Sequence, residues 1–169
     1  KITPDGVVTT FAGAAGQWGN IDGTGVNARL YGPSGLAADA SGNLYVGSLA
    51  HNTVRKITSA GVVSNLAGIA FNPGYQDGTG TGALFQNVYG IATDSSGNVY
   101  VSDQGNQNIR KITAAGVVTT LAGSNSASPS TGSTDGTGTL ARFNVPRHLA
   151  IDANRNLYVA EIGRASCRE

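Results

Sequence analysis

The sequence has few of the residues that build most catalytic and metal sites. Its 169 residues include one cysteine, two histidines, one tryptophan and no methionine. Cys167 lies in the last nine residues, so the chain before it has no thiol for a disulfide or a catalytic cysteine. A zinc site normally needs three or four converging His, Cys or carboxylate groups, and His51 and His148 stand in different sequence contexts. These scarcities argue against a metal centre and against cysteine chemistry.

Charge and long apolar runs are also scarce. Charged residues make up 12% of the chain and the formal net charge is +1. The protein therefore has no overall electrostatic field that would attract a nucleic acid or an anionic membrane surface. No apolar run reaches the roughly 18 residues that a membrane-spanning helix needs. The 25 glycines and 40% hydrophobic residues are too apolar for disorder and too glycine-rich for a helical domain. The composition therefore predicts an all-β protein with many turns.

The sequence repeats itself at intervals of about 55 residues. The segments KITPDGVVTTFAG, KITSAGVVSNLAG and KITAAGVVTTLAG begin at Lys1, Lys56 and Lys111. An Asp-Gly-Thr-Gly motif recurs from Asp22, Asp77 and Asp135, and a GLAADASGNLYV-like segment recurs from Gly35, Gly90 and His148. A fixed period of this length indicates an array of one structural unit.

Each unit contains four short β-like runs, which in the middle unit are residues 90–94, 98–103, 108–113 and 117–122. Turns containing Gly97 and Gly116 join the first run to the second and the third to the fourth. Four strands linked in this way form an antiparallel meander, the blade of a β-propeller. The period is too long for a β-helix coil, and the Trp-Asp signature of WD40 blades and the kelch signature are absent. We expect a half blade at 1–13, blades at 35–68 and 90–123, and a half blade at 147–160.

The middle unit resembles the NHL repeat. The resemblance rests on Gly90-Ile-Ala-Thr-Asp94, Asn98-Val-Tyr-Val-Ser-Asp103, Gly105-Asn106 and Ile109-Arg-Lys-Ile112, in this order and spacing. It covers residues 1–160 and is similar to the long-loop bacterial variety. It implies a propeller, typically six-bladed, that binds proteins, RNA or glycans, with a minority of metal-dependent lyases and hydrolases among related propellers. The family's usual acid after the second strand is Asp103 in the middle unit, but Ser48 stands at that position in the unit before it. The usual Arg before Ile-Arg-Lys is replaced by Thr53 and Asn108.

Both ends of the chain indicate a part of a longer polypeptide. Lys1 falls inside a repeat, and EIGRASCRE interrupts the last repeat where a turn and a strand are expected. One choice of codons for that string resembles a sequencing adapter. We expect residues 162–169 to be non-native and Glu161 to be partly so; a divergent natural C-terminus is the alternative. About three blades remain, and propellers close with roughly four to eight, so we predict an open arc that self-associates through its bare edges.

One face of this arc is predicted to carry function. The connections between blades, residues 14–34, 69–89 and 124–147, are 21, 21 and 24 residues long and share a face with the loop between the second and third strands. Long loops on a rigid scaffold are typical of binding sites. Tyr31, Phe71 and Tyr89 are further aromatic residues of this face, and the candidate ligand residues on it are Trp18, Tyr75, His51, Asn52, Gln104, Asn106 and Gln107. Trp18 and Tyr75 have no aromatic counterpart in the other units, whereas Phe85 and Phe143 recur and are expected to fill gaps between blades. His51 is expected to be an exposed loop residue.

Recurrent charged residues are interpreted as structural. We expect Asp22, Asp77 and Asp135 to hold their turns by hydrogen bonds to the backbone, with calcium binding as the alternative. Asp39, Asp94 and Asp152 are predicted to cap the tight turns. Arg55 and Arg110 are expected to pair with acids such as Asp103, with phosphate contact as the alternative.

The sequence therefore favours a non-enzymatic binding scaffold for a protein, glycan or other ligand. It indicates no cofactor apart from the calcium alternative, and no membrane span. A metal-dependent lyase or hydrolase with its site at the central channel is one alternative, and a single-stranded RNA-binding domain is another. The low charge and the Ser, Thr, Asn and Gly-rich loops favour an extracytoplasmic location.

Overall fold

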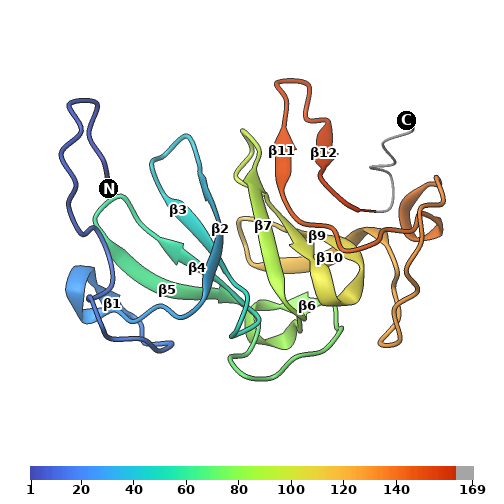
Figure 1. The fold of residues 1–169 in the computed structure, drawn as a ribbon, viewed down its shortest axis with the longest axis horizontal. Coiled ribbons are helices and arrows are strands. Elements are labelled where there is room, and N and C mark those ends of the chain that lie inside the picture. The colour runs from blue at the N-terminus through green and yellow to red at the C-terminus, as the bar shows by residue number, and fades with distance from the viewer. Residues whose placement is uncertain (163–169) are drawn as a thin grey trace.

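The computed structural model describes residues 1–162 and consists of antiparallel sheets set side by side (Figure 1). Two sheets have five strands each, in the orders β1-β5-β4-β3-β2 and β6-β10-β9-β8-β7, and a third consists of β11 and β12. The only helices in the described part are short 3-10 turns, none of which is long and apolar enough to cross a membrane. The all-β fold class predicted from the repeat is confirmed.

The two large sheets are complete blades. Blade 1 contains β2 (Pro33–Ala38), β3 (Leu44–Ser48), β4 (Thr53–Ile57) and β5 (Val62–Ala67). Blade 2 contains β7 (Val88–Thr93), β8 (Val99–Asp103), β9 (Asn108–Ile112) and β10 (Val117–Gly123). Consecutive strands pair as hairpins, which is the meander that the four β-like runs predicted.

Partial blades flank the complete ones. Residues 1–13 form an N-terminal hairpin, with Ile2 bridged to Val8. At the other end β11 (Leu149–Ile151) pairs with β12 (Leu157–Val159). In Figure 1 the N-terminal hairpin (dark blue) stands at the left edge, and the β11–β12 hairpin (red) stands beside β7. Of the segment 162–169 expected to be non-native, only Ile162 lies within the described residues.

Each complete blade has a fifth strand that the sequence did not predict. The Asp-Gly-Thr-Gly motifs supply β1 (Gly23–Thr24) and β6 (Gly78–Thr79), followed by the 3-10 turns η1 (Gly25–Asn27) and η2 (Gly80–Gly82). These strands pair with β5 and β10, the outer strands of their own blades. The third motif leads into η4 (Gly138–Leu140).

The same motif also joins neighbouring blades. The backbone N–H of Gly80 donates to the carbonyl of Gly116 in blade 2 (2.9 Å), and the carbonyl of Gly80 accepts from the N–H of Gly68 at the end of blade 1 (3.1 Å). Gly80 has a φ of +55°, which glycine adopts without strain. Gly25 makes the equivalent two bonds one repeat earlier.

The main core lies between the two blades. The inner strands β2 and β3 pack against β7, and the core residues include Tyr45, Val54, Phe85, Ile91 and Val101. The inner strands approach closely because glycine stands at the contact: a Cβ at Gly35 of β2 would lie 2.4 Å from the carbonyl oxygen of Tyr89 in β7. The next contact along the row is similar, since a Cβ at Gly90 would lie 2.0 Å from the carbonyl oxygen of Arg147, just before β11. Phe85 and Phe143 are both buried.

The tight turns opposite the long connections share one hydrogen-bond pattern. Asp94 accepts bonds from the backbone N–H groups of Ser96 and Asn98 (both 2.9 Å), from the Asn98 amide (2.8 Å) and from the Tyr100 hydroxyl (3.0 Å). Burial acts to raise the pKa of Asp94, but these bonds outweigh it and hold the pKa below its usual value. Asp39 and Asp152 occupy the same position in the other units and accept the equivalent bonds from Asn and Tyr.

Candidate binding face

The connections before β2 and before β7 lie along the lower side of Figure 1, the connection before β11 (orange) lies at its right, and the turns of the β2–β3, β7–β8 and β11–β12 hairpins point to the upper side. The connection between blades 1 and 2, residues 69–77, runs beneath the junction of the two blades. The face that the sequence predicted to bind ligand is therefore a continuous surface made of segments distant in the chain.

Four ring side chains from three of these segments stack on that face. Trp18 lies 5.1 Å from Tyr31, Tyr31 lies 4.8 Å from His51, and His51 lies 4.2 Å from Phe71, measured between ring centroids. Trp18 and Tyr31 come from the connection before β2, His51 from the β3–β4 loop, and Phe71 from the connection after β5. We call this group the aromatic ladder.

The two ends of the ladder are the most exposed, Tyr31 is 38% exposed, and His51 is buried. Trp18 is 70% and Phe71 71% exposed, whereas His51 is 1% exposed. Phe71 has a φ of +64°, a conformation that bulky residues rarely adopt, and its N–H donates to the carbonyl of His51 (3.3 Å). The backbone thus holds a large apolar ring in solvent at an energetic cost, which is typical of functional positions.

His51 is not the exposed loop residue that we expected from the sequence. Its imidazole is enclosed between Tyr31 and Phe71, and neither ring nitrogen has a hydrogen-bond partner within residues 1–162. Burial, together with the nearby charge of Arg55, lowers the pKa of His51. The ring is therefore neutral near pH 7 and acts as a flat packing surface for its neighbours.

Asn52 and Gln107, two further candidates for ligand contact, are buried and link blades. The Asn87 backbone N–H donates to Oδ1 of Asn52 (2.8 Å), and the Val145 N–H donates to Oε1 of Gln107 (2.7 Å). Asn52, Gln107, Asn87 and Val145 all have φ between +55° and +58°. Each bond fixes the chain just before the first strand of the next blade. Placing these two side chains among ligand contacts was wrong, because their acceptors are used inside the scaffold.

The remaining candidates also contact the scaffold. The buried Asn106 amide donates to the carbonyl of Gly74 and to Asp103 (both 2.8 Å). The Tyr75 hydroxyl lies 2.9 Å from the Thr120 hydroxyl, and its half-buried ring lies against the Arg110 guanidinium, 5.1 Å from Cζ. Gln104 is half-buried at the start of η3 (Gln104–Asn106). Among the seven candidates, Trp18 is the one that is mainly exposed.

The recurrent arginines lie at the back of the face and pair with the Asp-Gly-Thr-Gly motif. In blade 2, Arg110 pairs with Asp103 (2.9 Å) and with Asp77 (2.6 Å), and donates to the carbonyls of Leu84 and Gln76. Burial raises the pKa of Asp103 to about 6, against the opposing effect of Arg110. Asp77 also accepts from the N–H of Thr120 (3.1 Å). The local turn role expected for this aspartate is wrong, because its carboxylate ties β6 to β9 and β10.

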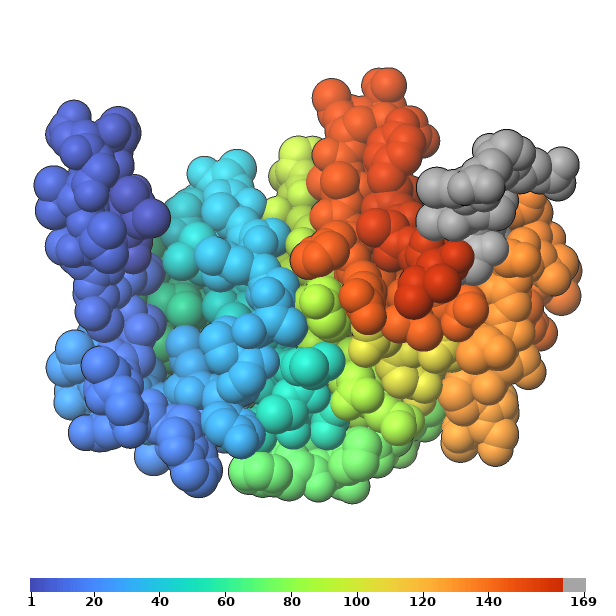
Figure 2. Space-filling model, viewed as in Figure 1, coloured from blue at the N-terminus to red at the C-terminus, as the bar shows by residue number. Residues whose placement is uncertain are grey.

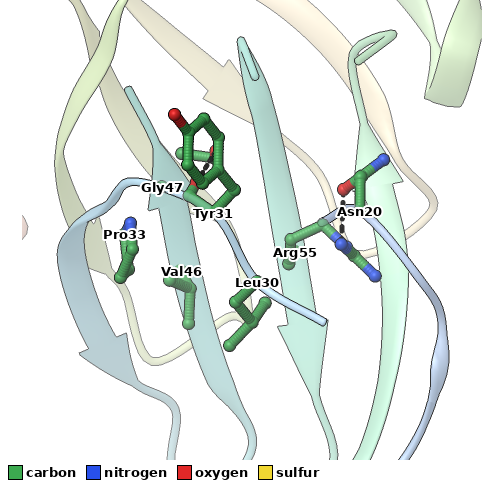
Figure 3. Close-up of a pocket in the computed structure, with 8 residues that line it drawn as sticks. Asn20, Leu30, Tyr31, Pro33, Val46, Gly47 and Arg55 are labelled. Carbon is green, nitrogen blue, oxygen red and sulfur yellow. Dashed lines mark hydrogen bonds between the residues drawn. The ribbon is translucent and has the colours of Figure 1, made fainter. Parts of the chain in front are cut away.

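Blade 1 has a substitute for the missing acid. Ser48 stands where blade 2 has Asp103. Arg55 keeps the pair with the aspartate of the motif, here Asp22 (2.5 Å), and donates in addition to the side-chain oxygen of Asn20 (Figure 3). Asn20 comes from the connection that carries Trp18. Arg55 therefore anchors that connection, and with it one end of the aromatic ladder.

The slot beside Arg55 is too narrow to hold a ligand. It is lined by Asn20, Leu30, Tyr31, Pro33, Val46, Gly47, Ser48 and Arg55 and has no room for a water molecule (Figure 3). Residues 1–162 contain no group of three or more His, Cys, Asp or Glu side chains close enough to share a metal ion. The candidate site is thus the exposed surface of the aromatic ladder.

Comparison with known structures identifies the fold. The chain superposes on a protein of unknown function from Bacteroides thetaiotaomicron with a TM-score of 0.66 and 31% identity, over 73% of this chain and 31% of the other. It also superposes on an auxiliary nutrient binding protein from Bacteroides ovatus with a TM-score of 0.68 and 21% identity, over 82% of this chain and 36% of the other. The fold is that of a β-propeller.

The propeller fold is shared with an enzyme as well as with a binding protein. A gluconolactonase from Xanthomonas campestris superposes with a TM-score of 0.54 and 17% identity, over 78% of this chain and 35% of the other. The chain spans about a third of the length of these structures. No family model matches the sequence, and no curated protein matches it. At these identities the similarity to the nutrient-binding protein and the lactonase concerns the fold alone.

Proposed function

We propose that this chain belongs to an NHL-type propeller that acts as a non-enzymatic binding scaffold, with the aromatic ladder as its ligand platform. One observation carries the proposal: Trp18 and Phe71 are about 70% exposed at the two ends of a group of four rings in which Tyr31 is partly exposed and His51 is buried. Exposed apolar rings that are held in place by buried neighbours are typical of interaction sites.

The ladder suits a ligand with flat, uncharged surfaces. Its rings are tilted by 38°, 42° and 60° from one to the next, so they present ring faces and edges in several directions. The neutral His51 brings no charge to the stack, and the cation of Arg55 is buried beneath it. Such rings accept the planar or apolar faces of sugars and of proline or aromatic side chains. A protein segment or a glycan therefore fits the surface better than a polyanion does.

The assignment to NHL-type repeats is supported by the agreement between the motif and its contacts. The family's acid after the second strand is Asp103 in blade 2, where it pairs with the arginine of Ile-Arg-Lys-Ile. In the last unit Glu161 stands at this position, and its carboxylate accepts from the N–H of Asn144 (2.7 Å), as Asp103 accepts from the N–H of Gln86 (2.7 Å). The same scaffold bond thus recurs where the repeat predicts it.

Trp18 is the only tryptophan of the chain, so its fluorescence reports directly on the platform. We would titrate the protein with a panel of neutral oligosaccharides and proline-containing peptides while recording this emission. A ligand of the platform is expected to shift the emission and to lose about tenfold or more in affinity with Phe71→Ala. Trp18→Ala, followed by calorimetry, is expected to give a similar loss.

Val62→Ala is the matched control, because Val62 is an exposed apolar residue of β5 outside the ladder. It is expected to leave affinity unchanged. A ligand whose affinity is unaffected by both Trp18→Ala and Phe71→Ala would show that binding occurs elsewhere and would refute the platform.

A further inference from the structure

The imidazole of His51 is a buried polar group without a partner. The residue is 1% exposed, and within residues 1–162 it is the only side chain with two buried polar atoms that lack a hydrogen-bond partner. Buried polar atoms are nearly always hydrogen-bonded, because a group that leaves water without a replacement bond costs stability. Two such atoms in the middle of the aromatic ladder therefore require an explanation.

The equivalent position in blade 2 shows how the scaffold normally uses this residue. Asn106 stands there, and its amide donates to a carbonyl of the preceding connection and to the carboxylate of Asp103 (both 2.8 Å). Blade 1 has Ser48 in place of the acid, and the Ser48 hydroxyl donates to the carbonyl of Tyr31 (2.6 Å) and accepts from the backbone N–H of His51 (3.3 Å). The His51 side chain therefore makes neither of the scaffold bonds that Asn106 makes.

Another side chain anchors the connection in blade 1. The Asn106 bond holds the connection before β7, whereas the connection before β2 is held by Arg55, which donates to the side-chain oxygen of Asn20. The scaffold thus does not depend on a polar group at His51. A phenyl ring would fill the same space without burying two polar atoms, so the imidazole nitrogens point to a role outside the scaffold.

Phe71 is the neighbour of His51 that can uncover the imidazole. Its ring lies 4.2 Å from His51 but is 71% exposed, so the side chain can rotate without displacing packed atoms. Figure 2 shows the connection that carries Phe71 (green) at the surface of the lower side. On the other side of His51, Tyr31 is enclosed by Trp18 and its carbonyl is fixed by Ser48. A ligand accordingly reaches the imidazole from the side of Phe71.

We propose that His51 is the polar recognition residue of the aromatic ladder and that the ladder binds a neutral glycan. This inference rests on the proposed platform and assigns the class of its ligand. On binding, the Phe71 ring turns aside and stacks on the apolar CH face of one sugar ring. A hydroxyl at the rim of that sugar then bonds to an imidazole nitrogen of His51, and Trp18 contacts a further sugar of the chain.

A sugar fits this site better than a proline or an aromatic side chain does, because one sugar ring carries both of the required chemistries. Its CH face packs on an aromatic ring, and the hydroxyls at its rim both donate and accept hydrogen bonds. A neutral imidazole has one nitrogen that donates and one that accepts, so a hydroxyl can pair with either. The proline side chain offers neither group. The Arg55 cation is buried behind the ladder, so the ligand needs no charge.

Titration with neutral trisaccharides tests the ligand class. The panel contains trisaccharides of glucose, mannose, galactose and N-acetylglucosamine, together with a polyproline peptide, and binding is followed by Trp18 emission and calorimetry. At least one trisaccharide is expected to bind, and its affinity is expected to fall about three- to tenfold with His51→Phe. His148→Phe is the matched control, because it makes the same change at an exposed histidine outside the ladder. It is expected to leave affinity unchanged.

The variant separates recognition from packing. His51→Phe keeps a ring in the ladder and removes the two unpartnered nitrogens, so at pH 7.5 it is expected to melt at or above the temperature of the parent. Weaker binding by a variant of this stability cannot come from unfolding. A trisaccharide that binds the parent and His51→Phe equally well would overturn the role of His51.

The other outcomes distinguish this inference from the platform itself. Binding of the peptide alone, lost in Trp18→Ala, would support the platform and overturn the glycan. No binding by any member of the panel would overturn the glycan as well. A trisaccharide that binds but is unaffected by Trp18→Ala, Phe71→Ala and His51→Phe would refute the platform together with this inference.

Nitrogen-15 NMR of the histidine rings tests the contact without a variant of His51. The chain has two histidines, so in His148→Phe the ring nitrogen resonances come from His51 alone. Saturation with the bound trisaccharide is expected to shift one of these two resonances, because one nitrogen gains a hydrogen bond. Two unchanged resonances at saturation would overturn the contact between the sugar and His51.

Discussion

Asp103 and Arg110 form an ion pair at 2.9 Å in which neither side chain is exposed to solvent. The carboxylate also accepts from the N–H of Gln86 and from the Asn106 amide, so it connects β8 and β9 with the connection that precedes β7. Arg110 lies between the rings of Tyr75 and Phe85, each 5.1 Å from Cζ. One buried pair thus organises both the interior of blade 2 and the base of its ligand-facing loops.

Removing the arginine should destabilise blade 2 more than blade 1. Arg110→Met leaves the buried Asp103 carboxylate unpaired and is expected to lower the free energy of unfolding by roughly 3 to 5 kcal/mol. Arg55→Met leaves Asp22, whose side chain is 60% exposed and returns to water, and is expected to lower it by about 1 to 3 kcal/mol. Urea unfolding followed by circular dichroism measures both. Equal losses of unfolding free energy in the two variants would show that the burial of Asp103 does not determine the size of the effect.

The bond between Asn52 and Asn87 should contribute measurably to the coupling of the blades. Asn52→Gly removes the acceptor but tolerates the φ of +58°, and leaves the Asn87 N–H without its partner. We expect a loss of about 1 to 3 kcal/mol in the free energy of unfolding. Asn52→Ala should lose more, because alanine adds backbone strain at positive φ. Urea titration of the three proteins orders them, and a glycine variant as stable as the parent would contradict the bond's role.

Close packing of the inner strands depends on Gly90. A methyl group there would meet the backbone carbonyl of Arg147, which cannot move aside as a flexible side chain can. Gly90→Ala is therefore expected to lower the free energy of unfolding by at least about 2 kcal/mol. Gly82→Ala is the matched control, since a Cβ at Gly82 meets nothing within 4 Å. The control should change stability by less than about 1 kcal/mol. Similar melting temperatures for the two variants would show that the inner strands can move apart without a loss of stability.

His51 should make stability depend on pH. Its folded-state pKa is below the unfolded value of 6.5, so below about pH 6.5 the unfolded chain binds a proton that the folded chain does not. The contribution of a neutral His51 is therefore fully present above pH 6.5 and decreases as the pH falls below it. His51→Phe keeps a ring in the stack and removes the proton. Melting temperatures at pH 7.5 and pH 5.0 test this: the parent should lose more on acidification than the variant. A pH response identical in both would refute the assignment.

The periodic parts of the fold could be predicted from the sequence, because each blade strand is a short run of β-branched and aromatic residues between glycine turns. The observed strands of blade 2 differ from the predicted runs by two residues or fewer at each end. The strand made by Gly78 and Thr79 could not be predicted in this way, because two small residues carry no alternation and pair only through their backbone.

The candidate site was less accessible to such reasoning. The sequence predicted that Trp18 and Phe71 share a face, but only the fold brings them to either side of Tyr31 and His51, from segments more than fifty residues apart. His51 and Asn106 occupy the same position in successive repeats, which could have indicated a buried site. Asn52 and Gln107 have side chains typical of ligand contacts, and their use as acceptors for the next blade depends on backbone geometry that no local pattern reveals.

The paired bonds of Gly25 and Gly80 make the outer wall of the arc a main-chain network that runs from one repeat to the next without relying on any side chain. The side chains of the connections can consequently change over evolution, and the connections can lengthen, while the wall keeps its geometry. Recognition can therefore diverge through the side chains of a connection, while the backbone atoms of the same connection keep the architecture.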